Sequence, residues 1–229
     1  MKSIRYLFLT ATTFATFTVS LPAAAQTVTH FRAIINESAV IAEGVQGTGA
    51  KAHGIGDFVL TQHHDHAGES KTTMSYSIQL FGVDLDGTQT ATPLDNVTAV
   101  HLHDVTECMP MYPQCQPGDT ALTMHVLNIY GYPRQDDDDL VVDPVAGTLT
   151  GLWDDGDENL EPPAETLKIS DHMVLDLLFS GNIYFMLHTN EFPNAAIGGQ
   201  LVIVPEPTQC VALAFSLLAG LGSLRRHVV

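Results

Sequence analysis

Short runs in which apolar and polar residues alternate recur along most of the chain, separated by Gly, Pro, Asn and Asp. This period of two is typical of a strand with one buried face. The runs are residues 30–35, 56–61, 73–83, 97–103, 122–130, 183–188 and 197–204. So many runs without an intervening linker predict one all-β domain, an antiparallel Greek-key β-sandwich. The one helical pattern is residues 170–178, where Ser170 or Asp171 can cap the first turn.

The first 25 residues have the composition of a secretory signal peptide. Lys2 and Arg5 precede an uncharged apolar run at residues 6–21, and three alanines at 23–25 offer a small-residue cleavage site. A hydrophobic first helix of the domain is the alternative, but the basic start and the alanines favour a signal cut before Gln26.

The last 25 residues, 205–229, predict a second targeting segment. In order they hold Pro205, Glu206 and Pro207, the uncharged residues 208–224, and Arg225 with Arg226. Seventeen helical residues span roughly 25 Å, near the lower limit for a single transmembrane helix. The order of the three features resembles the PEP-CTERM sorting signal of Gram-negative bacteria. That resemblance implies an inner-membrane intermediate, cleavage by an exosortase-type enzyme, and release to the cell surface or extracellular matrix; an anchor that is never removed has the same topology.

Residues 26–204 are then the folded domain, and their charge restricts its partners. Four of the nine Lys and Arg residues lie in the terminal segments, but only one of the 26 acidic residues does, so the net charge of −17 is concentrated in the domain. Such an acidic surface repels phosphate backbones and anionic headgroups, which excludes nucleic-acid binding and peripheral membrane binding.

Two cysteines of the domain agree with export. Cys108 and Cys115 lie in a Pro-rich loop, and in an oxidising compartment they are expected to form a local disulfide. A soft-metal site is the alternative, but this spacing fits the usual zinc patterns poorly.

Three histidines form the main candidate metal site. His101 and His103 are two residues apart on a predicted strand, so their side chains share a face and can chelate one copper or zinc ion. His188 is the expected third ligand. The alternative is that these histidines only satisfy backbone carbonyls or carboxylates such as Asp104 at the rim of the sheet.

A second group of histidines is expected in a hairpin turn. His63, His64 and His66 can bind Cu²⁺ or Zn²⁺ opportunistically, although a solvated polar turn explains them equally. The remaining candidates, His53, His125 and His172, are isolated in the sequence and are interpreted as ordinary, partly buried residues.

Residues 134–165 lack a clear alternation and are expected to be irregular. They contain two acidic runs, residues 136–139 and 154–158. A calcium loop starting at Asp155 would place Asp157 and Asn159 well, but Leu160 replaces its turn glycine and Thr166 its last carboxylate. Calcium binding is therefore not expected, and solvated acidic loops are the interpretation.

Four segments of the domain resemble the chordin-type family known as CHRD. They are residues 30–33 (HFRA), 54–56 (GIG), 101–103 (HLH) and 188–201 (HTNEFPNAAIGGQL). The chain departs from the family pattern at Asp104, where members commonly have Gly, and at residues 196–200, which lack a Glu and an Arg. The resemblance implies an immunoglobulin-like or superoxide-dismutase-like β-sandwich in an exported protein and supplies no catalytic residues.

No catalytic motif supports an enzyme. The sequence has no G-x-S-x-G, no P-loop and no H-E-x-x-H. The function expected from the sequence is an exported, surface-sorted binding or structural domain of the envelope or exopolysaccharide matrix, whose partner is a polysaccharide or a surface protein. The alternative is a copper- or zinc-binding metalloprotein, distantly like superoxide dismutase.

Overall fold

The computed structural model describes residues 25–42, 49–64, 70–104, 125–162 and 164–205. Several predicted features lie outside these residues: the signal peptide up to residue 24, His66, Cys108, Cys115 and the sorting segment from Glu206 onward. None of the helices in the described residues has the length and apolar character needed to span a bilayer.

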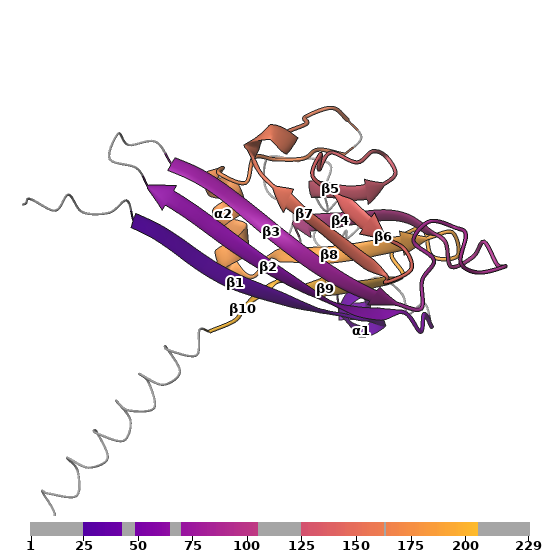
Figure 1. Ribbon diagram of the computed structural model, residues 1–229. Coiled ribbons are helices and arrows are strands. Elements are labelled where there is room, and N and C mark those ends of the chain that lie inside the picture. The colour runs from indigo at the N-terminus through magenta and orange to yellow at the C-terminus, as the bar shows by residue number, and fades with distance from the viewer. Residues whose placement is uncertain (1–24, 43–48, 65–69, 105–124, 163, 206–229) are drawn as a thin grey trace, which may run out of the picture.

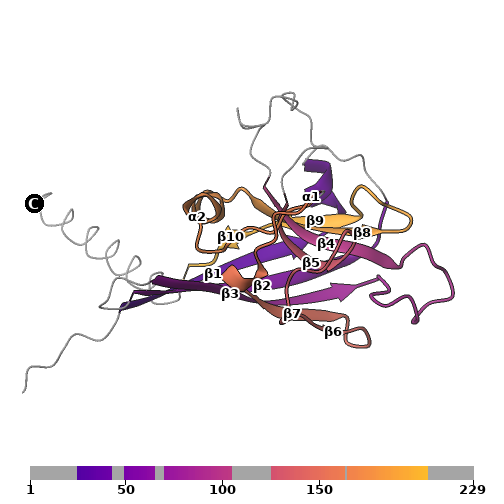
Figure 2. The same cartoon turned by 90° about the horizontal axis from the view of Figure 1, so that it is seen from above.

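Two antiparallel sheets face each other in the described part of the chain (Figures 1 and 2). The larger sheet has the order β10-β1-β2-β3-β7-β6, and the smaller has the order β5-β4-β8-β9. The strands of the larger sheet are β1 (Ala25–Ile35), β2 (His53–His64), β3 (Ser70–Phe81), β6 (Val141–Asp143), β7 (Thr148–Trp153) and β10 (Val202–Ile203). The strands of the smaller sheet are β4 (Val97–Asp104), β5 (His125–Gly131), β8 (Ile183–Thr189) and β9 (Ile197–Gln200). The predicted all-β sandwich is confirmed.

The core lies between the sheets and is formed by the apolar side chains on the inward faces of the strands. Its largest fully buried side chains include Trp153, Phe31, Phe58 and Phe185. The indole N–H of Trp153 donates to the carbonyl of Leu167 at 2.9 Å, so its one polar group is satisfied inside the core. Removing any of these aromatic side chains would cost about 3–5 kcal/mol, because a large cavity would remain.

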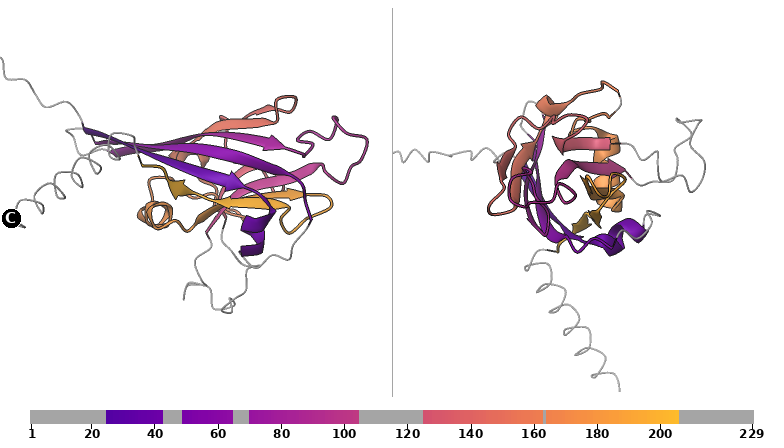
Figure 3. Two further views of the ribbon diagram at one scale, coloured as in Figure 1. Left: turned by 90° about the horizontal axis from the view of Figure 1, so that it is seen from below. Right: turned by 90° about the vertical axis from the view of Figure 1, so that its right-hand side faces the viewer.

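Helices occupy the ends of the sandwich. Helix α2 (His172–Ser180) forms close to the predicted position and ends at Gly181, whose φ of 75° is the left-handed conformation that favours glycine. The short helix α1 (Glu37–Ala42), which the sequence did not predict, follows β1 and lies near β9 (Figure 3).

The expectation that residues 134–165 are irregular was wrong for β6, β7 and the 3-10 helix η2 (Asp155–Asp157). The alternation of β7 is hidden because Gly151 stands between Leu149 and Trp153 on its inward face. A Cβ at Gly151 would collide with the Tyr76 hydroxyl and the Asp137 carboxylate. The inward position is thus filled by a buried polar pair from elsewhere, so no apolar residue marks it in the sequence.

Candidate functional site

Strand β4 places two histidines on the outer face of the smaller sheet. Val100 and Leu102 are fully buried and face the core. Side chains alternate along a strand, so His101 and His103 point away from that core, and they share one face as the sequence predicts. Both are nevertheless buried, at 3% and 5% exposure.

Strand β5 adds a histidine and an asparagine through two irregularities. In the pairing with β4, His101 lies opposite Asn128 and His103 opposite His125. The register shifts twice between the two strands, so β5 carries extra residues relative to β4. Each extra residue reverses the alternation locally. His125 and Asn128, three apart in sequence, can therefore both reach the rings of β4.

Strand β8 supplies the fourth ring. His188 lies opposite Ala99 of β4, close to His101 along the same face. Its Nδ1 is 2.9 Å from the carbonyl oxygen of Pro193. A carbonyl can only accept, so Nδ1 carries the proton and the neutral ring has its lone pair on Nε2. That Nε2 is buried and has no hydrogen-bond partner.

These four residues, His101, His103, His125 and His188, are called the histidine cluster below. The ring centres of His101, His103 and His188 are separated by 5.5, 5.3 and 6.2 Å. Rings that share a tetrahedral ion have centres roughly 5–6 Å apart, given metal–nitrogen bonds of about 2 Å. His125 lies closer, at 4.2 Å from His101 and 4.4 Å from His103, so it packs against them.

Asn128 contacts two rings of the cluster at once. Its Oδ1 is 2.9 Å from Nδ1 of His101 and 2.9 Å from Nδ1 of His125. Its Nδ2 donates to the carboxylate of Asp136 at 2.7 Å. A carboxylate accepts and does not donate when ionised, so this contact identifies which end of the amide faces the histidines.

Asp136 is held in its ionised form by the groups around it. Burial alone would raise its pKa, but hydrogen bonds from Thr166, Asn128 and Asn159 and the charge of Arg134 lower the pKa below its usual range. The Arg134 guanidinium lies 2.9 Å from the carboxylate, and the Thr166 hydroxyl donates to it at 2.6 Å.

Burial keeps the rings of His101, His125 and His188 uncharged at neutral pH. Burial lowers the pKa of His101 to about 3, and the neighbouring His125 and His188 lower it further, against hydrogen bonds to Asn128 and to the backbone of Tyr132. Burial is also the main cause that lowers the pKa of His125 and of His188. Neutral imidazole is the form that binds a metal ion, so these three rings need no proton loss to act as ligands.

A second group of possible ligands is acidic and includes Asp137, which contacts Tyr76 on β3 of the larger sheet. Among the described residues, donor atoms of three side chains lie within 4.8 Å of one another at Asp137, Asp138 and Asp157, a spacing that no three rings of the histidine cluster meet. Asp137 accepts a hydrogen bond from the buried Tyr76 hydroxyl, which stays protonated because burial and that carboxylate raise its pKa. Burial raises the pKa of Asp157 to about 6.

The residues of the calcium loop tested in the sequence have other partners. Asp155 accepts hydrogen bonds from the amide and hydroxyl of Ser170, at 3.0 and 2.7 Å. Asn159 donates to Asp136 at 2.9 Å. Asp157 belongs to the acidic group described above, so these side chains do not converge on one centre.

The second predicted histidine group is only partly described. His63 and His64 belong to strand β2 and pair with Lys71 and Ser70 of β3. They therefore end a regular strand, where a turn was expected, and His63 is exposed. His66 lies beyond the described part.

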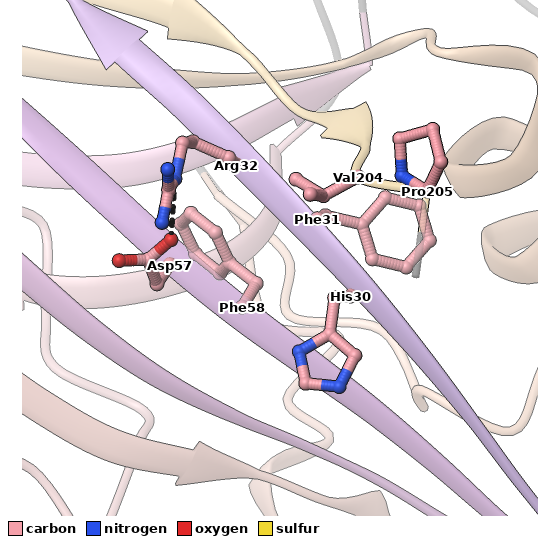
Figure 4. A pocket seen from close by; sticks show the side chains of 7 residues that line it. All are labelled: His30, Phe31, Arg32, Asp57, Phe58, Val204 and Pro205. Atoms are coloured by element: carbon pink, nitrogen blue, oxygen red, sulfur yellow. Dashed lines mark hydrogen bonds and ion pairs between the residues drawn. The ribbon is translucent and has the colours of Figure 1, made fainter. Parts of the chain in front are cut away.

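A hollow of about 370 Å³ lies away from the histidine cluster, at the edge formed by β1, β2 and the end of the described chain (Figure 4). Arg32 and Asp57 form an exposed ion pair of 2.7 Å beside it. None of the predicted metal ligands lines this hollow.

Sequence reasoning missed two residues of the site. The interpretation of His125 as isolated was wrong, because its ring contacts two others in the cluster. Asn128 was not considered. The only signal was their presence on the strand after the H-x-H strand, and regular alternation would have placed them on opposite faces.

A comparison with models of known families matches residues 31–201 to the CHRD domain. No curated protein and no solved structure matches the chain. The matched residues are about three quarters of the sequence and include both sheets and all four histidines. The chain therefore belongs to the CHRD domain family.

Proposed function

We propose that this protein is an exported metal-binding domain that holds one copper or zinc ion at the histidine cluster, with His101, His103 and His188 as ligands. The observation that carries the proposal is the buried Nε2 of His188, which has a lone pair and no partner and belongs to a ring 5.3 Å from that of His101. A buried nitrogen acceptor without a partner costs free energy, and a metal ion would remove that cost.

The donor set favours ions of borderline softness. Imidazole suits copper and zinc, and for nitrogen sites copper(II) binds more tightly than zinc. Three protein ligands leave a fourth position for water or a small ligand. The rings must turn slightly to bring their nitrogens within bonding distance of one ion, because the nitrogens of the three rings do not all lie within 4.8 Å of one another.

The fold agrees with this function. Two facing antiparallel sheets with an H-x-H strand are also the arrangement in the superoxide-dismutase-like class of sandwich, which the sequence brought into consideration. A redox activity of that kind is not part of the proposal, because no described feature indicates a substrate.

Metal content tests the proposal. The protein, exported and purified without a His tag, should contain close to one copper or zinc ion per chain by mass spectrometry of the elements. His188→Ala should lower the content to a small fraction, whereas the exposed His172→Ala, on α2 and outside the cluster, should leave it unchanged. His125→Gln should still bind one ion per chain. Equal metal content in the wild type and His188→Ala would rule out the proposed site.

The address proposed for the protein is the cell surface or extracellular matrix of a Gram-negative bacterium. It rests on the two terminal segments and on Cys108 and Cys115, for which an oxidised, disulfide-bonded pair is expected after export. The exosortase-type enzyme that cleaves near Pro205 is the proposed processing partner. An extracellular polysaccharide or a surface protein is the proposed binding partner in the matrix.

A further inference from the structure

Asn128 occupies an unusual position behind the histidine cluster. It is fully buried, and its side-chain oxygen Oδ1 lies at hydrogen-bond distance from two imidazole nitrogens on different strands. An oxygen with two lone pairs can accept from both rings at the same time. The contact is therefore complete only when both rings carry their proton on Nδ1.

The orientation of the amide is decided on its opposite side. Asn128 Nδ2 lies 2.7 Å from Asp136 and 3.1 Å from the Thr166 hydroxyl oxygen. Turning the amide over would place its oxygen against the ionised Asp136 and its NH₂ against the rings. The repulsion between two acceptors makes that arrangement unfavourable, so the ion pair of Arg134 with Asp136 indirectly sets the direction of the amide.

We propose that Asn128 is the positioning residue of the metal site: it fixes His101 and His125 in the tautomer with Nδ1–H and leaves the Nε2 lone pair of His101 for the ion. The inference rests on the proposed function and names the residue that prepares its ligands. A hydrogen bond from the far nitrogen of a ligand histidine orients the ring and makes it a better donor, and loss of such a partner typically weakens binding 10- to 100-fold.

A competing arrangement exists for His101. The backbone of Tyr132 also lies near the His101 ring and favours the protonated form of that ring. The Tyr132 carbonyl is therefore a second acceptor that His101 can use. If the proton of the neutral ring were on Nε2 and pointed to Tyr132, His101 would have no lone pair for the ion on that nitrogen. The two arrangements differ in which nitrogen carries the proton, and this can be measured directly.

The first measurement uses the wild-type, metal-free protein labelled with ¹⁵N. Two-bond nitrogen–proton correlations distinguish the two neutral tautomers of histidine, and His101 and His125 should both show Nδ1–H. An Nε2–H tautomer at His101 overturns the inference. This measurement requires no substitution and does not depend on metal binding.

The second measurement compares two variants for copper affinity. Asn128→Leu removes the acceptor and should weaken copper binding by 10- to 100-fold, with mixed tautomers in the metal-free protein. Thr166→Val is the matched control, because it also removes hydrogen bonds to Asn128 and Asp136 in the same buried segment but leaves the contact with the rings. Its affinity should stay within about threefold of the wild type, since the ring contacts that set the ligands are kept.

The outcomes separate this inference from the proposed function. A wild type that binds no copper or zinc overturns both. A wild type that binds one ion, together with an Asn128→Leu variant that binds equally well, overturns only the positioning role. An equal loss of affinity in Thr166→Val also overturns it, because the effect would then come from general disturbance of the segment. Should Asn128→Leu not fold, the tautomers of the wild type decide the question.

Discussion

At the scale of one residue, burial of His101 makes the free energy of unfolding of the metal-free protein depend on pH. Its ring is 3% exposed, and burial holds its pKa at about 3, against an ordinary value of 6.5. The unfolded chain therefore binds a proton at His101 below pH 6.5, and the folded chain does so only near pH 3. Proton uptake by the unfolded state lowers the free energy of unfolding as the pH falls through this window.

The metal-free protein should consequently lose stability between about pH 6.5 and pH 4, by up to roughly 3 kcal/mol from His101 alone. Urea unfolding in the presence of a chelator, repeated across this range, measures the slope. His101→Gln cannot be protonated and should have a shallower slope, while the exposed His172→Gln should keep that of the wild type. Identical slopes in all three proteins would contradict the assignment.

Asp157 acts in the opposite direction. Its folded pKa is raised to about 6, so between its ordinary value and pH 6 the folded state holds a proton that the unfolded state releases. This contribution favours the folded state at low pH and is lost as the pH rises through 6. The comparison of His101→Gln with the wild type cancels it, because Asp157 is unchanged in both.

At the scale of elements, the two sheets are joined along one side by the end of β1 and the middle of β9. The amide of Asn36 donates to the carbonyl of Gly198 at 2.9 Å, and the amide of Gly198 donates back to Asn36 at 3.1 Å. The next residue, Gly199, packs against the backbone of β1, where a Cβ would lie 2.6 Å from the carbonyl oxygen of Ile34. Only a residue without a side chain fits this seam.

Gly199→Ala should destabilise the fold by about 1–3 kcal/mol, because the added methyl group meets backbone that cannot move aside cheaply. Thermal or urea unfolding measures the change. Gly156→Ala is the matched control: its added Cβ meets only the Asp154 side chain, which can rotate away, and it should cost less than about 1 kcal/mol. An equally small loss of stability in Gly199→Ala and Gly156→Ala would contradict the close contact between Gly199 and β1.

Strands β4, β8 and β5 show which parts of the histidine cluster could be predicted from the sequence and which could not. The alternation in β4 and β8 predicted the position of both strands, and the spacing in β4 predicted that His101 and His103 share a face, because a regular strand has a fixed period. The irregular pairing of β5 broke that rule, since one extra residue moves every following side chain to the other face. His125 and Asn128 therefore required the structure.

At the scale of the whole molecule, the strand order brings the two ends of the described chain to one sheet. The domain is strongly acidic, and the described chain starts and ends on neighbouring strands, β1 and β10, of one sheet (Figure 1). The first and last strands of the described chain therefore lie side by side in the larger sheet, with the histidine cluster on the other sheet.

If the sorting segment works as proposed, the surface form of the protein should end near residues 204–207, because the transpeptidase cleaves at the Pro-Glu-Pro triplet. Mass spectrometry of the C-terminal peptide from cell-surface material measures this. A variant with Pro205 and Pro207 both replaced by Ala should keep the tail and stay with the inner membrane. Surface protein that still contains Arg226 would refute the processing step.

The pairing of β1 with β10 makes this domain suited to circular permutation. The amide of Val204 donates to the carbonyl of His30 at 2.8 Å, and β1 begins at Ala25, so the two ends lie roughly 17 Å apart at strand spacing. A short flexible linker could join them and keep every strand pair. The turn between β6 and β7 offers a place to open the ring, because Val145 there is 91% exposed. The sandwich could then be inserted into a loop of another protein by that turn, with its histidine cluster intact.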